Sequence, residues 1–212
     1  MRVVVCDAGL GNLRSVERAL LEAGRGIPVR VEVTSDPARI ASADRVVMPG
    51  QGGFGDCARA LSGALGDAVQ THVRSGRPYL GICLGLQVLF DASEEAPGCP
   101  GLGVLEGRVV RLRGGVDAAT AMPLKVPHVG WNTVHGTGAS PLLPAPAGSA
   151  PHFYFVHSFV VKPVRRDVVA ATTDYGEPFV SAVAFDNVLA CQFHPEKSAR
   201  AGLALLEGFL RS

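Results

Sequence analysis

A cysteine with a glycine two residues away on either side is the stretch of the sequence best suited to chemistry. It reads Gly81-Ile82-Cys83-Leu84-Gly85. The apolar run from Tyr79 predicts a strand, residues 84–90 predict the helix after it, and this spacing is that of a nucleophile elbow. A Cβ at either flanking position would crowd the neighbouring strand or helix, and the sharp turn strains the nucleophile's backbone. Cys83 is therefore the candidate nucleophile; an ordinary buried cysteine is the alternative.

A nucleophilic cysteine needs a base, and the end of a late apolar strand supplies a candidate. His194 ends that strand, Pro195 prevents its continuation, and Glu196 follows. Residues two apart point the same way on an extended backbone, so Glu196 can fix the imidazole tautomer and stabilise its charged form. The alternative is that His-Pro-Glu only caps the last helix, which would begin at Ser198.

The composition narrows the class of protein. The 212 residues carry a formal net charge of +1, from 20 basic and 19 acidic side chains, which indicates no nucleic-acid partner. The five cysteines form no Cys-x-x-Cys pair, which favours a reducing compartment over a disulfide framework. An acid at Asp7 interrupts any secretory segment, and no apolar run is long enough to span a membrane. We therefore expect a cytoplasmic protein.

Other polar and sulfur-bearing residues favour structural roles. His128 and His157 lack a second ligand at helical spacing, so we expect no metal site. Cys6 and Cys191 lie on apolar strands and are expected to be structural. Trp131 could face a partner, although a lone tryptophan more often packs in a core.

The first half of the chain alternates strands with helices, which predicts a doubly wound α/β fold with a mostly parallel sheet. Ligands of such sheets bind outside the carboxyl ends of the strands. Three loops, 7–12, 49–54 and 83–87, are expected there. The expected strands are 3–6, 29–33, 45–48 and the one ending at Cys83, and the expected helices are 13–23, a short one capped by Asp36, 56–73 and 84–90.

The second half is rich in β-structure, with turn signals typical of an antiparallel meander. We expect 93–103 to be a loop and 136–151 to be a surface loop. We expect one domain, residues 1–212, in which the parallel and antiparallel halves share a core. The expected strands are 107–112, 126–134, 154–161, 168–172, 179–185 and 188–193, followed by a helix at 198–210.

The motifs resemble those of a known family. Gly-Ile-Cys-Leu-Gly-x-Gln (81–87) and Gln-Phe-His-Pro-Glu (192–196) look like the class I, or triad, glutamine amidotransferases. More particular segments resemble the glutaminase subunits of imidazole glycerol phosphate synthases in histidine biosynthesis, and the match runs from residue 3 to the last helix. Those segments are 9–16, 48–54, 126–132, 154–158 and 194–198.

The resemblance implies a fold and roles for individual residues. The fold is the single-domain, flavodoxin-like α/β fold of these amidotransferases, and no cofactor is implied. Cys83 would be the nucleophile, His194 the general base and acid, and Glu196 its orienter. The oxyanion hole would comprise Gly50, Gln51, Gly52 and Leu84. Glutamine would contact Gln87, Ser158 with its backbone neighbours, and Glu95, which has Glu94 as its neighbour in the chain.

The resemblance also implies a partner, a (β/α)₈-barrel cyclase subunit that receives the ammonia in a heterodimer. The pair would form imidazole glycerol phosphate and an aminoimidazole carboxamide ribonucleotide. The implied partner interface includes Asn12, Trp131 and Lys197. Two departures from the family pattern stand near the site, Ala8 in place of an aromatic residue and Gln51 in place of a small aliphatic one.

Three other functions compete with this one. The glutaminase of pyridoxal phosphate synthesis also docks on a barrel, but the segment Val-Pro-His-x-Gly-Trp-Asn (126–132) speaks against it. A free-standing cysteine hydrolase would act on an ester or peptide without a partner. A non-catalytic glutamine sensor would bind glutamine without turning it over.

Overall fold

Alternating apolar residues in the first strand build a core on each face of one sheet. Strand β1 (Arg2–Cys6) points Val3 and Val5 into one cluster of buried side chains and Val4 and Cys6 into another. All four side chains are fully buried. The continuous apolar run thus forms a strand that is covered on both faces, as a parallel strand requires.

The computed structural model describes residues 1–116, 120–143 and 150–212. The parallel part of its large sheet has the strand order β2-β1-β3-β4-β13. Neighbouring strands of this part all pair in parallel. Besides β1, its strands are β2 (Arg30–Thr34), β3 (Arg45–Gly50), β4 (Tyr79–Cys83) and β13 (Val188–Cys191).

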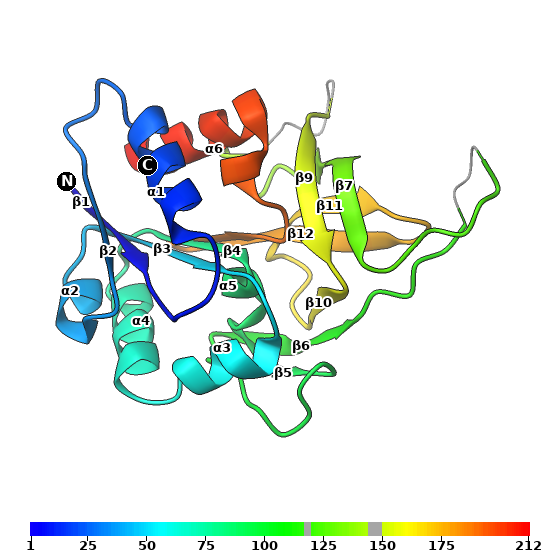
Figure 1. Cartoon of the computed structure of the whole chain (residues 1–212), viewed down its shortest axis with the longest axis horizontal. Helices are drawn as coiled ribbons and strands as arrows, with labels where there is room; N and C mark the ends of the chain where they lie inside the picture. Colours follow the sequence, from blue (N-terminus) through cyan, green and yellow to red (C-terminus); the bar gives the residue numbers. More distant parts are fainter. Residues whose placement is uncertain (117–119, 144–149) are drawn as a thin grey trace.

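Helices cover both faces of this parallel part (Figure 1). Helices α1 (Leu13–Ala23) and α6 (Ala199–Arg211) share one apolar cluster, and they pack against each other. The opposite face is covered by α2 (Pro37–Ala41), α3 (Phe54–Ala60) and α4 (Ala64–Arg74). The predicted doubly wound α/β architecture is confirmed.

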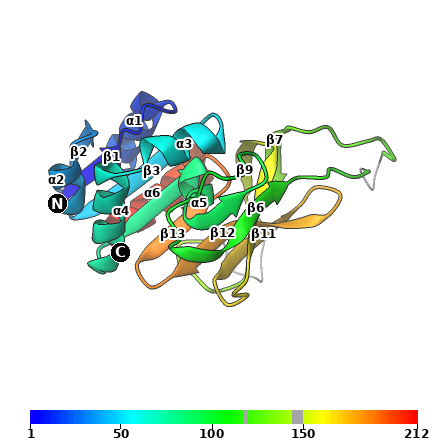
Figure 2. The ribbon, with the colours of Figure 1, turned by 90° about the horizontal axis from the view of Figure 1, so that it is seen from below.

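Beyond β13 the sheet becomes mostly antiparallel and continues in the order β12-β10-β6-β5, with β11 beside β12 and β8 beside β11. A separate two-stranded sheet, β7-β9, lies at this end of the molecule (Figures 1 and 2). The strands are β5 (Phe90–Ser93), β6 (Leu105–Arg111), β7 (His128–Thr133), β8 (His135–Gly136), β9 (His152–His157), β10 (Phe159–Pro163), β11 (Val169–Asp174) and β12 (Pro178–Phe185).

The prediction of one helix over 56–73 is wrong. The chain forms α3 and α4 instead, and between them Gly63 takes a backbone φ of +115°, which interrupts a right-handed helix. The expected helix over 84–90 is also too long. Helix α5 (Leu84–Gln87) ends early because the carbonyls of Val88 and Leu89 accept from the loop before β6.

The expected strand over 154–161 is divided between two sheets. Strand β9 pairs with β7, whereas β10 pairs with β6 and β12 in the large sheet. Ser158 stands at the break between them. Of the expected surface loop at 136–151, residues 144–149 lie outside the described residues. No helix in the described ranges is long and apolar enough to cross a membrane.

The turn between β4 and α5 packs without room for a side chain on either flanking glycine. A Cβ added to Gly85 would lie 1.8 Å from the carbonyl oxygen of Met48 on β3. A Cβ added to Gly81 would lie 2.4 Å from the carbonyl oxygen of Gly85 and 2.9 Å from the Cβ of Ala190. The crowding predicted at both positions is confirmed.

We expect Gly85→Ala to lower the free energy of unfolding by more than about 3 kcal/mol, because the backbone of β3 or α5 must move. Gly98→Ala is the matched control, since its Cβ would meet nothing within 4 Å and only its positive φ of +85° opposes the change. That strain costs about 1–2 kcal/mol. Urea unfolding of both variants measures the difference, and equal losses would contradict the packing argument.

Candidate active site

Cys83 stands where β4 ends and α5 begins. Its backbone has φ 55° and ψ −103°, a conformation that side chains rarely adopt and that costs about 1–3 kcal/mol. The buried Tyr79 hydroxyl donates to the carbonyl of Gly85 at 3.0 Å, which helps to hold the turn. The strained elbow predicted from the sequence is confirmed.

Strand pairing brings His194 to the same end of the sheet. Strand β13 runs parallel to β4, with Cys191 opposite Ile82, so the residues after both strands emerge together. His194 Nδ1 donates to Glu196 Oε1 at 2.8 Å, and the two side chains are 1% and 2% exposed. His194 Nε2 is buried and has no hydrogen-bond partner among the described residues.

The electrostatic surroundings of His194 favour its charged form. Burial opposes the charge, but interactions with Cys83 and with Glu196 outweigh it and raise the pKa of His194 from 6.5 to about 9. The imidazolium is therefore the main form at neutral pH. A buried imidazolium beside a sulfur atom can act as a general acid toward a leaving group.

The His-Pro-Glu turn is anchored to strand β9. The hydroxyl of Ser198 donates to the carbonyl of His194 at 2.6 Å and accepts from the amide of Tyr154 at 2.9 Å. The Ser198 side chain makes no capping hydrogen bond to α6. The polar groups of this segment thus hold the histidine in place, and the helix-cap alternative gains no support.

A cavity of about 370 Å³ opens beside Cys83. The predicted site residues that line it are Gln51, Gly52, Cys83, Leu84, Gln87, Glu95, Ser158 and Lys197. Pro127, which precedes β7 of the expected partner surface, and His157 and Phe159, which flank Ser158, also line it. The lining residues without a predicted role are Tyr154 and Val156. The predicted residues that lie outside its lining are Asn12, Gly50, Trp131, His194 and Glu196.

The predicted oxyanion loop lies against the start of α5. Gly50 is opposite Cys83 in the pairing of β3 with β4, and a Cβ on Gly50 would lie 2.7 Å from the Cβ of Leu84. Gly52 has a φ of +123°, which favours glycine. Gln51 is half-buried at the cavity. The loop and the Leu84 amide are thus near the sulfur, and their oxyanion role stays a prediction.

The structure separates Glu95 from its neighbour Glu94. Glu95 Oε2 accepts from the amide of Phe54 at 2.8 Å, at the start of α3 beside the oxyanion loop. Glu94 Oε2 instead accepts from the amide of Arg111 on β6, and Glu94 does not line the cavity. Glu95 is therefore the better candidate for a substrate contact.

The side chain of His157 was not assigned a role at the site from the sequence, although its backbone was expected near glutamine as a neighbour of Ser158. His157 Nδ1 and the carbonyl of Phe159 are 2.9 Å apart, and His128 Nδ1 lies 3.0 Å from His157 Nε2. Burial lowers the pKa of His128 to about 4 and that of His157 to about 3. Both rings are neutral at neutral pH.

The described residues contain no group of three side chains that could hold a metal ion.

Gln192 was also not predicted as a site residue. Its side chain is fully buried and lies 3.5 Å from the sulfur of Cys83. A signal was present in the sequence, since Gln192 precedes His194 by two residues on an extended chain.

The other buried thiols are poor nucleophiles, because burial raises the pKa of Cys6 and of Cys57 to about 12.

The three predicted interface residues lie in different places. Asn12 is exposed and caps α1, its Oδ1 accepting from the amide of Ser15 at 3.2 Å. Trp131 on β7 is 52% exposed, so the alternative that it packs in the core is wrong. Lys197 lines the cavity, with its Nζ 5.8 Å from the ring centroid of Tyr154.

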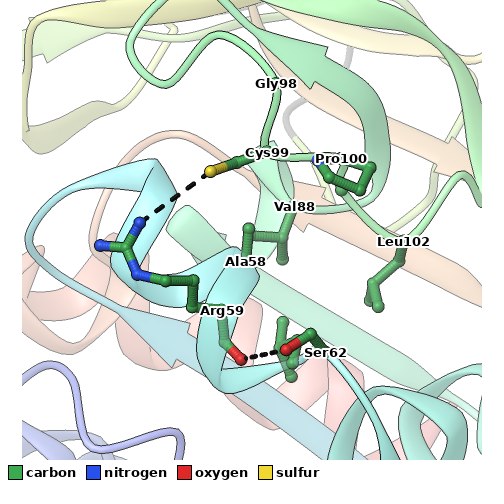
Figure 3. A pocket seen from close by; sticks show the side chains of 10 residues that line it. Ala58, Arg59, Ser62, Val88, Gly98, Cys99, Pro100 and Leu102 are labelled. Atoms are coloured by element: carbon green, nitrogen blue, oxygen red, sulfur yellow. Dashed lines mark hydrogen bonds between the residues drawn. The ribbon is translucent and has the colours of Figure 1, made fainter.

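A second cavity, of about 200 Å³, lies between α3 and the loop after β5 (Figure 3). It is mostly apolar, and Arg59 points across it toward Cys99, with Nη1 3.9 Å from the sulfur. None of the predicted site residues lines this cavity. Of these two cavities, only the first is lined by Cys83.

Comparison with known proteins gives a consistent picture. Residues 4–211 match the family described as Glutamine amidotransferase class-I. The imidazole glycerol phosphate synthase subunit HisH of Nitrosococcus oceani is 51% identical over 98% of this chain and 96% of its own length. Subunit HisH of Pyrococcus furiosus is 41% identical over 99% of this chain and 98% of its own length.

Solved structures match the fold. A structure described as a glutamine amidotransferase has a TM-score of 0.71 at 23% identity, covering 99% of this chain and 97% of its own. A putative GMP synthase protein from Thermoplasma acidophilum has a TM-score of 0.68 at 18% identity, covering 100% of this chain and 92% of its own. At these identities the likeness shows the fold alone.

We expect Glu196→Gln to lower the pKa of His194, because it removes one of the two groups that hold the ring charged. In the unchanged protein, the stability from protonated His194 is complete below pH 6.5 and is lost as the pH rises through about 9. In the variant this loss begins at lower pH. NMR titration of the ring, with Glu207→Gln on the exposed face of α6 as control, measures the change. An unchanged titration midpoint would contradict this account.

Proposed function

Since the chain belongs to the class-I glutamine amidotransferase family, and within it to the HisH subunits of imidazole glycerol phosphate synthase, we propose that it hydrolyses glutamine and supplies the ammonia for histidine biosynthesis. One observation carries the proposal. A strained cysteine, a buried His194–Glu196 pair and a cavity meet at the carboxyl ends of β4 and β13. The rest of the molecule keeps this arrangement in place.

The geometry suits a two-step reaction. The thiolate of Cys83 attacks the side-chain amide carbon of glutamine and forms a tetrahedral intermediate. Protonated His194 gives its Nε2 proton to the leaving ammonia, which leaves a glutamyl thioester on the sulfur. Neutral His194 then takes a proton from water as it attacks the thioester. Glutamate leaves and the thiolate is restored, while Glu196 holds the ring in one tautomer throughout.

The lining of the cavity suits the two ends of the substrate. The Leu84 amide and the loop Gly50, Gln51 and Gly52 lie on the side where the oxyanion would form. Gln87, Glu95 and Ser158 supply acceptors and donors for the charged amino and carboxylate groups of glutamine. The polar side chain of Gln51 lies in the cavity lining, so the departure at this position can touch the substrate.

We further propose that the chain acts with a (β/α)₈-barrel cyclase partner, in a heterodimer that forms imidazole glycerol phosphate and an aminoimidazole carboxamide ribonucleotide. Two large apolar side chains on β7, Val129 and Trp131, are 56% and 52% exposed, and such residues favour an interface. Pro127 and Lys197 connect this strand to the cavity. Asn12, at the start of α1, would also contact the partner.

The chain would act as one domain over residues 1–212, in a reducing compartment that we take to be the cytoplasm. Five free cysteines support such a compartment. The pyridoxal phosphate alternative and the free-standing hydrolase have no observation in their favour. The glutamine sensor differs from the proposed enzyme only in lacking turnover.

We expect Cys83→Ala to lower glutamine-dependent turnover at least about 10³-fold, because the covalent route is lost. Turnover of the complex with added ammonia should survive, since the cyclase then needs no glutaminase. Equal loss of both activities would refute the proposal. Detection of a glutamyl thioester on Cys83 by mass spectrometry would exclude the non-catalytic glutamine sensor.

We expect Trp131→Ala to weaken binding to the cyclase at least about tenfold, because a buried interface tryptophan commonly carries that much affinity. Leu21→Ala is the matched control, since Leu21 is 49% exposed and lies toward the opposite end of α1 from Asn12. Calorimetric titration measures both affinities. An unchanged affinity in Trp131→Ala would exclude β7 from the interface.

A further inference from the structure

The sulfur of Cys83 has a polar neighbour outside the triad. Gln192 Nε2 lies 3.5 Å from the sulfur, and Gln192 Oε1 lies 3.0 Å from Gln87 Nε2. Gln192 is fully buried and Gln87 is 3% exposed. A primary amide kept in the interior next to a reacting atom needs a reason, because burying it is costly unless its hydrogen bonds are made.

The direction of these hydrogen bonds follows from one fixed acceptor. The backbone carbonyl of Phe159 can only accept, and Gln87 Nε2 lies 3.3 Å from it. Gln87 therefore turns its NH₂ group toward both Phe159 and Gln192, so Gln192 must accept this hydrogen bond with its Oε1. Its own NH₂ group is then aimed at the sulfur. His157 Nδ1, 2.9 Å from the same carbonyl, must likewise donate.

We propose that Gln192 takes part in the reaction by donating a hydrogen bond to the thiolate of Cys83, with Gln87 as the residue that orients the amide. This inference rests on the proposed role of Cys83 as the nucleophile. A hydrogen bond from an amide to an anion in a buried site is stronger than one between neutral groups. It favours the thiolate before attack.

The same hydrogen bond serves the second half of the reaction. When water attacks the thioester, the carbon–sulfur bond breaks and the electron pair returns to sulfur. The Gln192 N–H then meets a developing negative charge, which it stabilises. Gln87 also lines the cavity, so one side chain contacts both the substrate space and the group that positions the nucleophile.

The test is the pH dependence of Cys83 alkylation by iodoacetamide, without glutamine, in Gln192→Met. Methionine has a similar length but no N–H to donate. We expect the midpoint of the profile to move to higher pH and the rate at neutral pH to fall about tenfold, as loss of a hydrogen bond to a charged group predicts. Mass spectrometry quantifies the alkylation of Cys83 and, as an internal reference in the same sample, the alkylation of the partly exposed Cys99.

Ser181→Ala is the matched control. Ser181 is fully buried, and its hydroxyl has no partner among the described residues. Its backbone carbonyl accepts from the backbone N–H of Gln192, so it lies close to Gln192 without touching the side-chain amide group under test. Its profile should not move. A folded Gln192→Met with an unchanged midpoint overturns the proposal.

Gln87→Met provides a second test that does not require Gln192→Met to fold. It removes the group that orients the Gln192 amide, so its midpoint should shift in the same direction, and no shift there also overturns the proposal. Alkylation needs no turnover. If the unchanged protein failed to hydrolyse glutamine, the proposed function would fall while the effect of Gln192 on the sulfur could still be measured.

Discussion

The close contact between Gly85 and the carbonyl of Met48 is the constraint on which the site depends. It holds the start of α5 against β3, with no space for even one methyl group. The chain can then pass from β4 to α5 only through a tight turn, and Cys83 takes the strained conformation in that turn. The same contact sets the distance between Leu84 and the loop that begins at Gly50. Nucleophile and oxyanion loop are thus placed by backbone packing, which does not relax as side chains do.

Two sets of histidines lie near the cavity in opposite charge states. His194 is kept charged by Cys83 and Glu196, whereas burial keeps His128 and His157 neutral. The neutral pair can act as fixed donors and acceptors, and they leave His194 as the ring that exchanges protons. The Phe159 carbonyl links the neutral pair to the sulfur, because it accepts from His157 and from Gln87, and Gln87 contacts Gln192 beside Cys83. A charged His157 would repel His194 and weaken its role as an acid.

Local spacing predicted the parts of the site that depend on a few consecutive residues. The elbow around Cys83 follows from turn geometry. His194 and Glu196 do meet, but through a 3-10 turn, η1 (Pro195–Lys197), and not through the extended backbone that was expected. Features set by distant pairing were missed or left open. The break of the 154–161 strand at Ser158, which was missed, depends on two different sheets. The choice between core and interface for Trp131, which was left open, depends on which face of β7 remains uncovered. Gln192 belongs to the Gln-Phe-His-Pro-Glu motif that was identified, but its contact with Cys83 was not predicted because the two residues are 109 positions apart in the chain.

The position of β13 between β4 and β12 has a consequence for synthesis of the chain. This strand and the His194–Glu196 turn are made almost last, so a growing polypeptide on the ribosome has its elbow long before its base. Until β13 arrives, one edge of β4 is unpaired and available to chaperones or to other nascent chains. Any chain cut short before residue 188 lacks His194 and Glu196, which the proposed triad needs to release ammonia. The order of the elements thus makes completion of the chain a condition for activity.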